Sequence, residues 1–163
     1  MKYSEAKLGR IFILRLEHGD KIPDIIEEFA AEQEIKSAVV HFLGGADTGS
    51  KVVVGPEDGT APKPRPMVTE LSGTSEAVGM GTLFINDAGM PKLHLHAAFG
   101  RGRDTVTGCT REGVVVWRIG EAVIFELLNT TAARRIDPGT GFELLELDFG
   151  EAWGRFCCFL THL

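Results

Sequence analysis

Two histidines and a cysteine carry the residue types and spacing of a metal site in this chain of 163 residues. His94 and His96 are two residues apart in the stretch 93–99, where apolar residues alternate with other side chains. Such alternation is typical of a half-buried strand and places both imidazoles on one face. Residues two apart on a strand have Cα atoms roughly 6–7 Å apart, so both rings can reach one ion.

Cys109 is expected to complete the site. A four-residue turn at 101–104 would pair the histidine strand with the β-favouring stretch 105–109. In that register Cys109 lies opposite His96 on the same face, with Cβ atoms roughly 4.5–5.5 Å apart. The set would leave one coordination position open. Zinc is the first choice because it favours nitrogen and sulfur ligands, and other divalent transition metals are the alternatives.

Catalysis at such a site would also require a group that transfers protons. Glu70 and Asp104 are the candidate acids or bases, although exposed carboxylates without a catalytic role are common. Arg101-Gly102-Arg103 resembles the core of an AT-hook, which inserts arginines into the minor groove of DNA. Asp104 stands where the hook's proline is expected, and a glycine turn with two solvated arginines is the alternative.

The first third of the chain predicts a strand and a helix. The apolar run at 8–16 is typical of a strand, much of which is expected to be buried. Apolar residues at helical spacing predict a helix at 23–33, with Asp20 as its candidate cap.

Further strands are predicted where β-favouring residues lie between turn signals. They fall at residues 37–43, 51–54, 67–72, 79–86, 93–99, 105–109, 114–119 and 121–128. His41 is expected to be a hydrogen-bonded core residue, and Gly44-Gly45 is expected to end its strand. The predicted fold is α+β, a mainly antiparallel twisted sheet of about eight or nine strands with one or two helices.

Composition narrows the class of protein. The length suits a single domain spanning 1–163, and no apolar run approaches a membrane span. The charged N-terminus lacks a signal-peptide core, so a cytoplasmic location is expected.

A net charge of −6 disfavours nucleic-acid binding through the overall electrostatic field of the protein. The apolar tail, 148–163, is expected to pack against the body or a subunit interface.

Several motifs, in order, resemble the plants-and-prokaryotes conserved (PPC) domain over about residues 8–147. They are Arg15-Leu16-Glu17-His18-Gly19-Asp20, Glu70-Leu71-Ser72-Gly73-Thr74, Leu93-His94-Leu95-His96, Gly108-Cys109, the stretch 121–126 and the stretch 135–142. The resemblance implies a compact α+β fold that assembles as a homotrimer, similar in fold to acetolactate decarboxylase, a metal enzyme with three histidine ligands. In plants the domain accompanies AT-hook proteins, and stand-alone prokaryotic members are often described as predicted DNA-binding proteins.

The family pattern includes a zinc site made by a His-x-His pair and a third histidine. His94 and His96 match the pair, and Cys109 stands at the third position. Cysteine either preserves the site as a zinc ligand or marks its loss. Two functions follow: a zinc-binding protein acting on a small carbonyl compound, or a DNA-associated or regulatory binding module whose metal is structural or absent.

Overall fold

The computed structural model describes residues 1–147, so the apolar tail at 148–163 lies outside the described residues. In order, the elements are β1 Lys7–Glu17, β2 Lys21–Ile22, α1 Asp24–Glu32, β3 Ser37–Ala46, β4 Lys51–Pro56, β5 Pro66–Glu70, β6 Ser75–Ile85, β7 Pro91–Arg101, β8 Asp104–Cys109, the 3₁₀ helix η1 Thr110–Glu112, β9 Val114–Leu128, β10 Ala133–Ile136 and β11 Glu143–Glu146. Within this range, no helix is long and apolar enough to cross a membrane.

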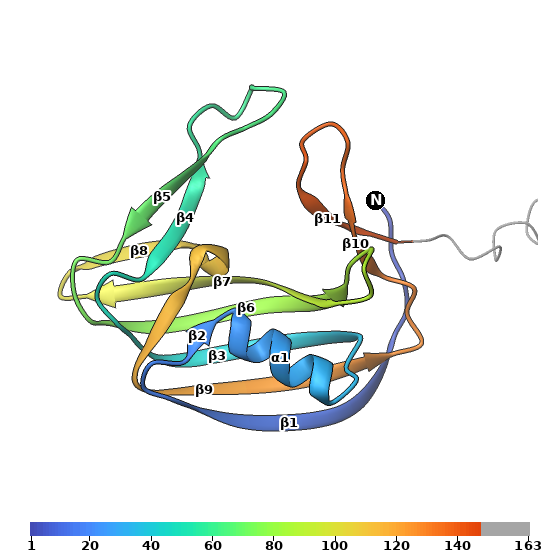
Figure 1. Cartoon of the computed structure of the whole chain (residues 1–163), viewed down its shortest axis with the longest axis horizontal. Helices are drawn as coiled ribbons and strands as arrows, with labels where there is room; N and C mark the ends of the chain where they lie inside the picture. The colour runs from blue at the N-terminus through green and yellow to red at the C-terminus, as the bar shows by residue number, and fades with distance from the viewer. Residues whose placement is uncertain (148–163) are drawn as a thin grey trace, which may run out of the picture.

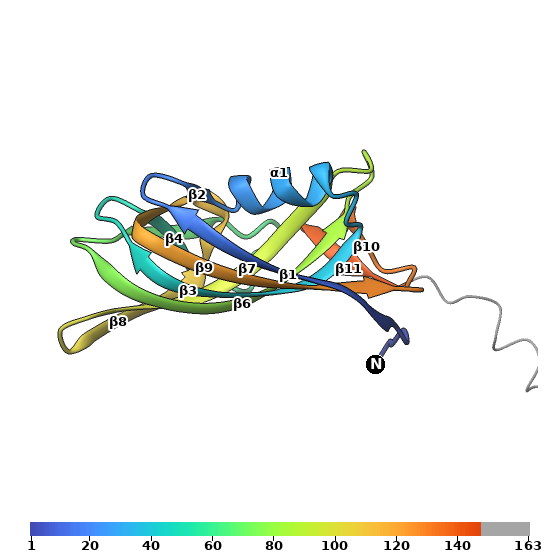
Figure 2. The ribbon, with the colours of Figure 1, turned by 90° about the horizontal axis from the view of Figure 1, so that it is seen from below.

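Nine strands form one sheet, in the order β1-β9-β3-β6-β7-β8-β4-β5, with β2 paired to β9 (Figure 1). Every strand pair in it is antiparallel. The helix α1 lies along one face of the twisted sheet (Figure 2). The strands β10 and β11 form a separate hairpin. This arrangement confirms the predicted α+β fold.

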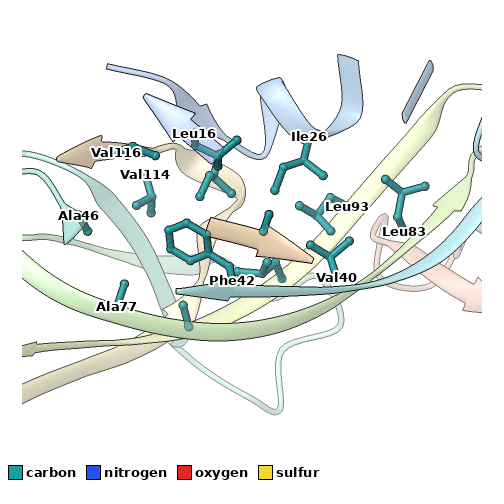
Figure 3. Close-up of a cluster of buried hydrophobic side chains, with 14 of the residues drawn as sticks. Leu16, Ile26, Val40, Phe42, Ala46, Ala77, Leu83, Leu93, Val114 and Val116 are labelled. Atoms are coloured by element: carbon teal, nitrogen blue, oxygen red, sulfur yellow. The ribbon is translucent and has the colours of Figure 1, made fainter. Parts of the chain in front are cut away.

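The hydrophobic core lies between α1 and the sheet (Figure 3). Ile26 of α1 and Val40 and Leu95 of the sheet are fully buried there. Alternate residues of the strands therefore face this core, and the residues between them face away from it. We call the face turned away from α1 the outer face; His41, Met80 and His96 lie on it, in one register row.

The predicted helix is present, but its predicted cap is wrong. Pro23 occupies the N-cap position of α1, which has no side-chain cap. Asp20 instead accepts a hydrogen bond at 2.8 Å from the backbone N–H of Glu17. The carboxylate thus closes the turn after β1, because a short acidic side chain satisfies nearby backbone donors as readily as helix donors.

Two predictions of burial are also wrong. Of β1 only Leu16 is buried. Ile11 and Ile13 are exposed on the outer face, because β1 is an edge strand covered on one side. His41 is exposed on the same face, with its ring against Phe125 at a centroid distance of 5.5 Å. An apolar run alone does not reveal which face of a sheet lacks a cover.

Gly44 and Gly45 were predicted to end their strand, but β3 continues through them to Ala46. The two strands predicted at 114–119 and 121–128 are one continuous strand, β9. The pairing of β3 with β9 shifts register between these glycines, opposite Arg118, which has a φ of 64°. A Cβ on Gly44 would lie 2.6 Å from the Cα of Gly120. The missing side chain lets β9 bulge against β3 without ending either strand.

Candidate metal centre

The hairpin of β7 and β8 sets the register predicted for the site. Its pairs run from His96 opposite Cys109 to Arg101 opposite Asp104. The loop between the strands is two residues long, shorter than predicted, and Gly102 within it has a φ of 63°. The register is nevertheless as predicted, because both loop lengths align the same pairs.

Packing of β7 fixes which way its histidines face. Leu93, Leu95 and Ala97 are buried in the core, so His94 and His96 face outward. On the neighbouring strand, a Cβ at Gly81 would lie 2.6 Å from the carbonyl oxygen of His94. The absence of a side chain at Gly81 lets β6 approach β7 closely, so that the two strands pair side by side in the sheet.

Cys109 lies at the end of β8, between β7 and β4. It is opposite His96 on one side and opposite Val53 on the other, and it is a free cysteine, only 4% exposed. One ligand atom from each of His94, His96 and Cys109 lies within 4.8 Å of the other two. The structure therefore brings the three predicted ligands together.

The geometry of the three ligand atoms is close to what a zinc ion requires. The Nε2 atoms of His94 and His96 are 3.0 Å apart, with the rings inclined at 81°. Tetrahedral zinc with ordinary bond lengths places its ligand atoms roughly 3.3 to 3.6 Å from one another. The three ligand atoms lie within 4.8 Å of one another, so binding of an ion would draw them closer together. Without an ion, the 3.0 Å separation suits a hydrogen bond in which one ring donates and the other accepts.

The surroundings of His94 favour its neutral form. Burial lowers the pKa of His94, and the positive charges of Arg134, His96 and Arg111 lower it further. A histidine must be neutral to offer its lone pair to a metal. The same groups therefore reduce the competition between a proton and a metal ion for the lone pair of His94.

Hollows lie on both sides of the three residues. One, of about 200 Å³, lies between Cys109, Pro64 of the loop that follows β4, and Phe142 beside β11. Another, of about 410 Å³, is on the outer face beside Met80 and both histidines. A fourth coordination position would be accessible to a small molecule.

The other predicted site residues gather elsewhere. Glu70 and Asp104 line a hollow of about 640 Å³ at the turn between β7 and β8, together with Arg101 and Arg103. The hollows that contain the histidines are lined by neither carboxylate. Arg101 Nη1 donates to the carbonyl oxygen of Thr74 at 2.8 Å, which holds its guanidinium beside the segment before β6.

Sequence reasoning missed two arginines near the centre. Arg111 and Arg134 line a hollow of about 600 Å³ with His94 and Cys109. Arg111 is only two residues after the predicted ligand Cys109, and this proximity in the sequence could have placed it near the centre. Arg134 lies far from His94 in the sequence, and its place beside His94 depends on how the β10–β11 hairpin folds back.

An open antiparallel sheet with one covering helix and a His-His-Cys cluster beside its free face defines the class of protein. The sequence model of the Plants and Prokaryotes Conserved (PCC) domain matches residues 3–128, and the chain belongs to this family. This is the family that the sequence motifs resemble. No match was found among curated proteins.

Solved structures of similar fold include a metal-containing protein of Archaeoglobus fulgidus, with 26% identity and a TM-score of 0.76 over 90% of this chain and 99% of that one. A plant- and prokaryote-conserved protein of Pyrococcus horikoshii has 21% identity and a TM-score of 0.73, over 91% and 100% of the two chains. A candidate DNA-binding protein of Ralstonia eutropha has 21% identity and a TM-score of 0.64, over 83% and 90%.

Proposed function

We propose that this protein binds one divalent transition metal ion, zinc first, through His94, His96 and Cys109, and acts on a small carbonyl compound at the open coordination position. The observation that carries the proposal is the convergence of the three ligand atoms within 4.8 Å. A similar protein of Archaeoglobus fulgidus is called metal-containing, which supports it.

The donor set suits zinc. Two imidazole nitrogens and one thiolate are its preferred ligands, and three protein ligands with an open position are typical of catalytic sites. When bound, such an ion would polarise a carbonyl oxygen or lower the pKa of a bound water. The chain itself supplies a neutral His94 and a Cys109 excluded from bulk water, which favours a stable ligand over a reactive thiol.

Metal analysis of the purified full chain tests this proposal. The wild type, after exposure to zinc and desalting, is expected to hold about one zinc per chain, and both His94→Ala and Cys109→Ser are expected to lose most of it. His41→Ala is the matched control, because His41 is an exposed histidine in the register row of His96 and should not change the zinc content. A wild type without zinc, or variants that keep it, would contradict the proposal.

We further propose that the chain assembles as a homotrimer through its outer face. The support is a group of exposed apolar side chains on that face: Ile11, Ile13, Leu43, Val78 and Met80. Met80 pairs with His96, so a neighbouring copy seated there would also lie beside the metal centre. Contiguous exposed apolar surface of this kind is typical of protein interfaces.

A DNA-associated or regulatory role is the second candidate function. It is supported by the name of the similar Ralstonia eutropha protein and by the exposed Arg103 beside Arg101 at the tip of a hairpin. Against it stand the net charge of −6 and the engagement of Arg101 with Thr74.

A DNA titration at two salt concentrations tests the second candidate. Binding that weakens steeply with salt, and weakens again in the Arg103→Gln variant, would support it. No retention of DNA at low salt would eliminate it.

A further inference from the structure

The hollow of about 600 Å³ beside His94 and Cys109 is lined by two arginines, Arg111 and Arg134, that make no ion pair within the described residues. It lies where β7 extends beyond the end of β8, since the pairing of these strands begins at His96. Arg134 of β10 and Arg111 of η1 line it from two sides of the histidine strand.

Arg134 is a buried cation without an ion-pair partner among residues 1–147. Its side chain is held by Thr82, whose hydroxyl and carbonyl oxygens accept from Nη2 at 2.8 and 3.2 Å. The residue is 4% exposed, and its Nε is buried and donates to no group in the described structure. Burial lowers the pKa of Arg134 from its ordinary value. A buried charge is costly unless an opposite charge compensates it, so an anion in this hollow would stabilise Arg134.

Arg111 supplies a second guanidinium that is not paired with a carboxylate in the described part of the chain. It is exposed and lies over the ring of Phe142, with 5.5 Å between the guanidinium carbon and the ring centroid. Stacking on a ring leaves the donors at the edge of the guanidinium free to meet an oxyanion.

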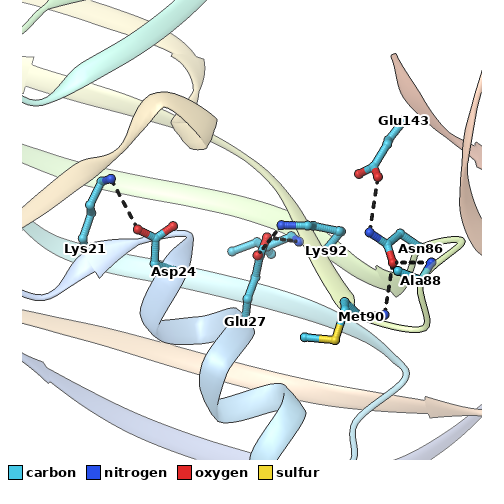
Figure 4. A network of polar contacts seen from close by, with 9 residues as sticks. Lys21, Asp24, Glu27, Asn86, Ala88, Met90, Lys92 and Glu143 are labelled. Carbon is cyan, nitrogen blue, oxygen red and sulfur yellow. Dashed lines mark hydrogen bonds and ion pairs between the residues drawn. The ribbon is translucent and has the colours of Figure 1, made fainter. Parts of the chain in front are cut away.

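The carboxylates that line the hollow have partners other than the two arginines (Figure 4). Asp24 pairs with Lys21 at 3.3 Å, and Glu27 pairs with Lys92 at 2.9 Å. Glu143 attracts Arg134 electrostatically, and its Oε1 accepts a hydrogen bond from Asn86 Nδ2 at 3.3 Å. All three acids line the hollow with the arginines, but the ion pairs of Asp24 and Glu27 are with lysines, so neither arginine is paired with a carboxylate there.

We infer that the hollow binds the anionic oxygen group of a small ligand between Arg111 and Arg134, with the rest of the ligand directed toward His94 and Cys109. The ligand class is a small organic anion, a carboxylate or a phosphate, because a guanidinium recognises both through paired N–H···O bonds. This inference rests on the proposed function for the role of the metal, but the arginines would bind the anion without it.

Titration calorimetry of the full chain with pyruvate, with inorganic phosphate and with neutral acetone tests the inference. Pyruvate or phosphate should bind, whereas acetone should not. The anion with the higher affinity shows whether the site prefers a carboxylate or a phosphate. Arg111→Gln should weaken anion binding about tenfold or more, since hydrogen bonds between charged groups contribute strongly. Arg103→Gln, which changes an exposed arginine far from this hollow's lining, should bind like the wild type.

A second variant and a metal-free arm keep the test decisive. Arg134→Gln should abolish anion binding, and circular dichroism of this variant shows whether it still folds. Arg111 is exposed, so the Arg111→Gln variant is expected to fold even if Arg134→Gln does not. Anion binding that persists in metal-free protein would support this site even if the zinc proposal fails. Zinc binding without anion binding, or anion binding unchanged by Arg111→Gln, would overturn the inference.

Discussion

At the scale of single residues, His94 differs from an ordinary exposed histidine in the charges around it. Burial and the nearby positive groups lower its pKa. The unfolded chain therefore takes up a proton at this position at a higher pH than the folded chain does. As the pH falls from about the ordinary value of 6.5 to the lower folded value, His94 reduces the free energy of unfolding.

Proton NMR of the metal-free protein checks this expectation. One imidazole, identified by its absence in the His94→Gln variant, should titrate below 6.5. The variant should also lose less stability than the wild type on acidification through that range, because it lacks the group that gains a proton on unfolding. Titration of His94 above 6.5 would contradict the expected effect of partial desolvation and of the nearby positive charges.

At the scale of elements, the contact of β8 with β4 depends on Gly108. A Cβ at this position would overlap the backbone oxygen of Val53, which cannot move independently of its strand. Gly108→Ala should therefore destabilise the fold by about 1–3 kcal/mol, typical of overpacking, and displace Cys109 next to it. Urea unfolding and zinc content would measure both effects.

Gly100→Ala is the matched control on the same hairpin. The nearest atoms to a Cβ at Gly100 are 3.9 Å away, which is ordinary contact. This variant should retain the stability and zinc content of the wild type. A Gly108→Ala protein that behaves like it would show that β4 does not constrain the metal centre.

The edge strand β1 is joined to β9 by a paired charge. Arg10 donates from Nε and Nη2 to both carboxylate oxygens of Glu126, at 2.7 and 2.8 Å. The hydrogen bond from Arg10 lowers the pKa of Glu126 despite its burial. The stabilisation is therefore fully present above the ordinary value of 4.5 and is lost as the pH falls through the lower folded value.

Glu126→Gln should lower the free energy of unfolding at neutral pH, and the difference from the wild type should vanish in acid. Urea denaturation at a series of pH values measures this difference. Glu28→Gln, on the exposed side of α1, should stay within about 0.5 kcal/mol of the wild type throughout. A difference that persists unchanged in strong acid would rule out the ion pair as its cause.

At the scale of the whole molecule, the outer face decides how the chain associates. Val78 and Ile13 are 65% and 84% exposed there. If the face is a trimer interface, Val78→Glu should dissociate the assembly, because a buried carboxylate without a partner is costly. Ala31→Glu, at an exposed position on the helix, should leave the assembly intact. Light scattering after size exclusion would measure both masses, and a monomeric wild type would contradict the proposal.

Local patterns predicted much of the fold. The helix at 23–33, the strands at 79–86 and 93–99 and the alignment of Cys109 with His96 were all predicted, because each depends on periodicity or on a short connection. The burial of β1 and of His41 was predicted wrongly. Alternation assigns side chains to two faces but does not say which neighbouring elements cover each face.

The sequence was sufficient to predict that His94, His96 and Cys109 lie together, since they come from two strands joined by a short turn. The surroundings of these three residues depend on the tertiary structure. It brought Arg134 from a distant hairpin to the side of His94, and it separated Glu70 and Asp104 from the histidine hollows. The physical reason is that register propagates along paired strands, whereas contacts between distant segments depend on how the whole sheet twists and packs.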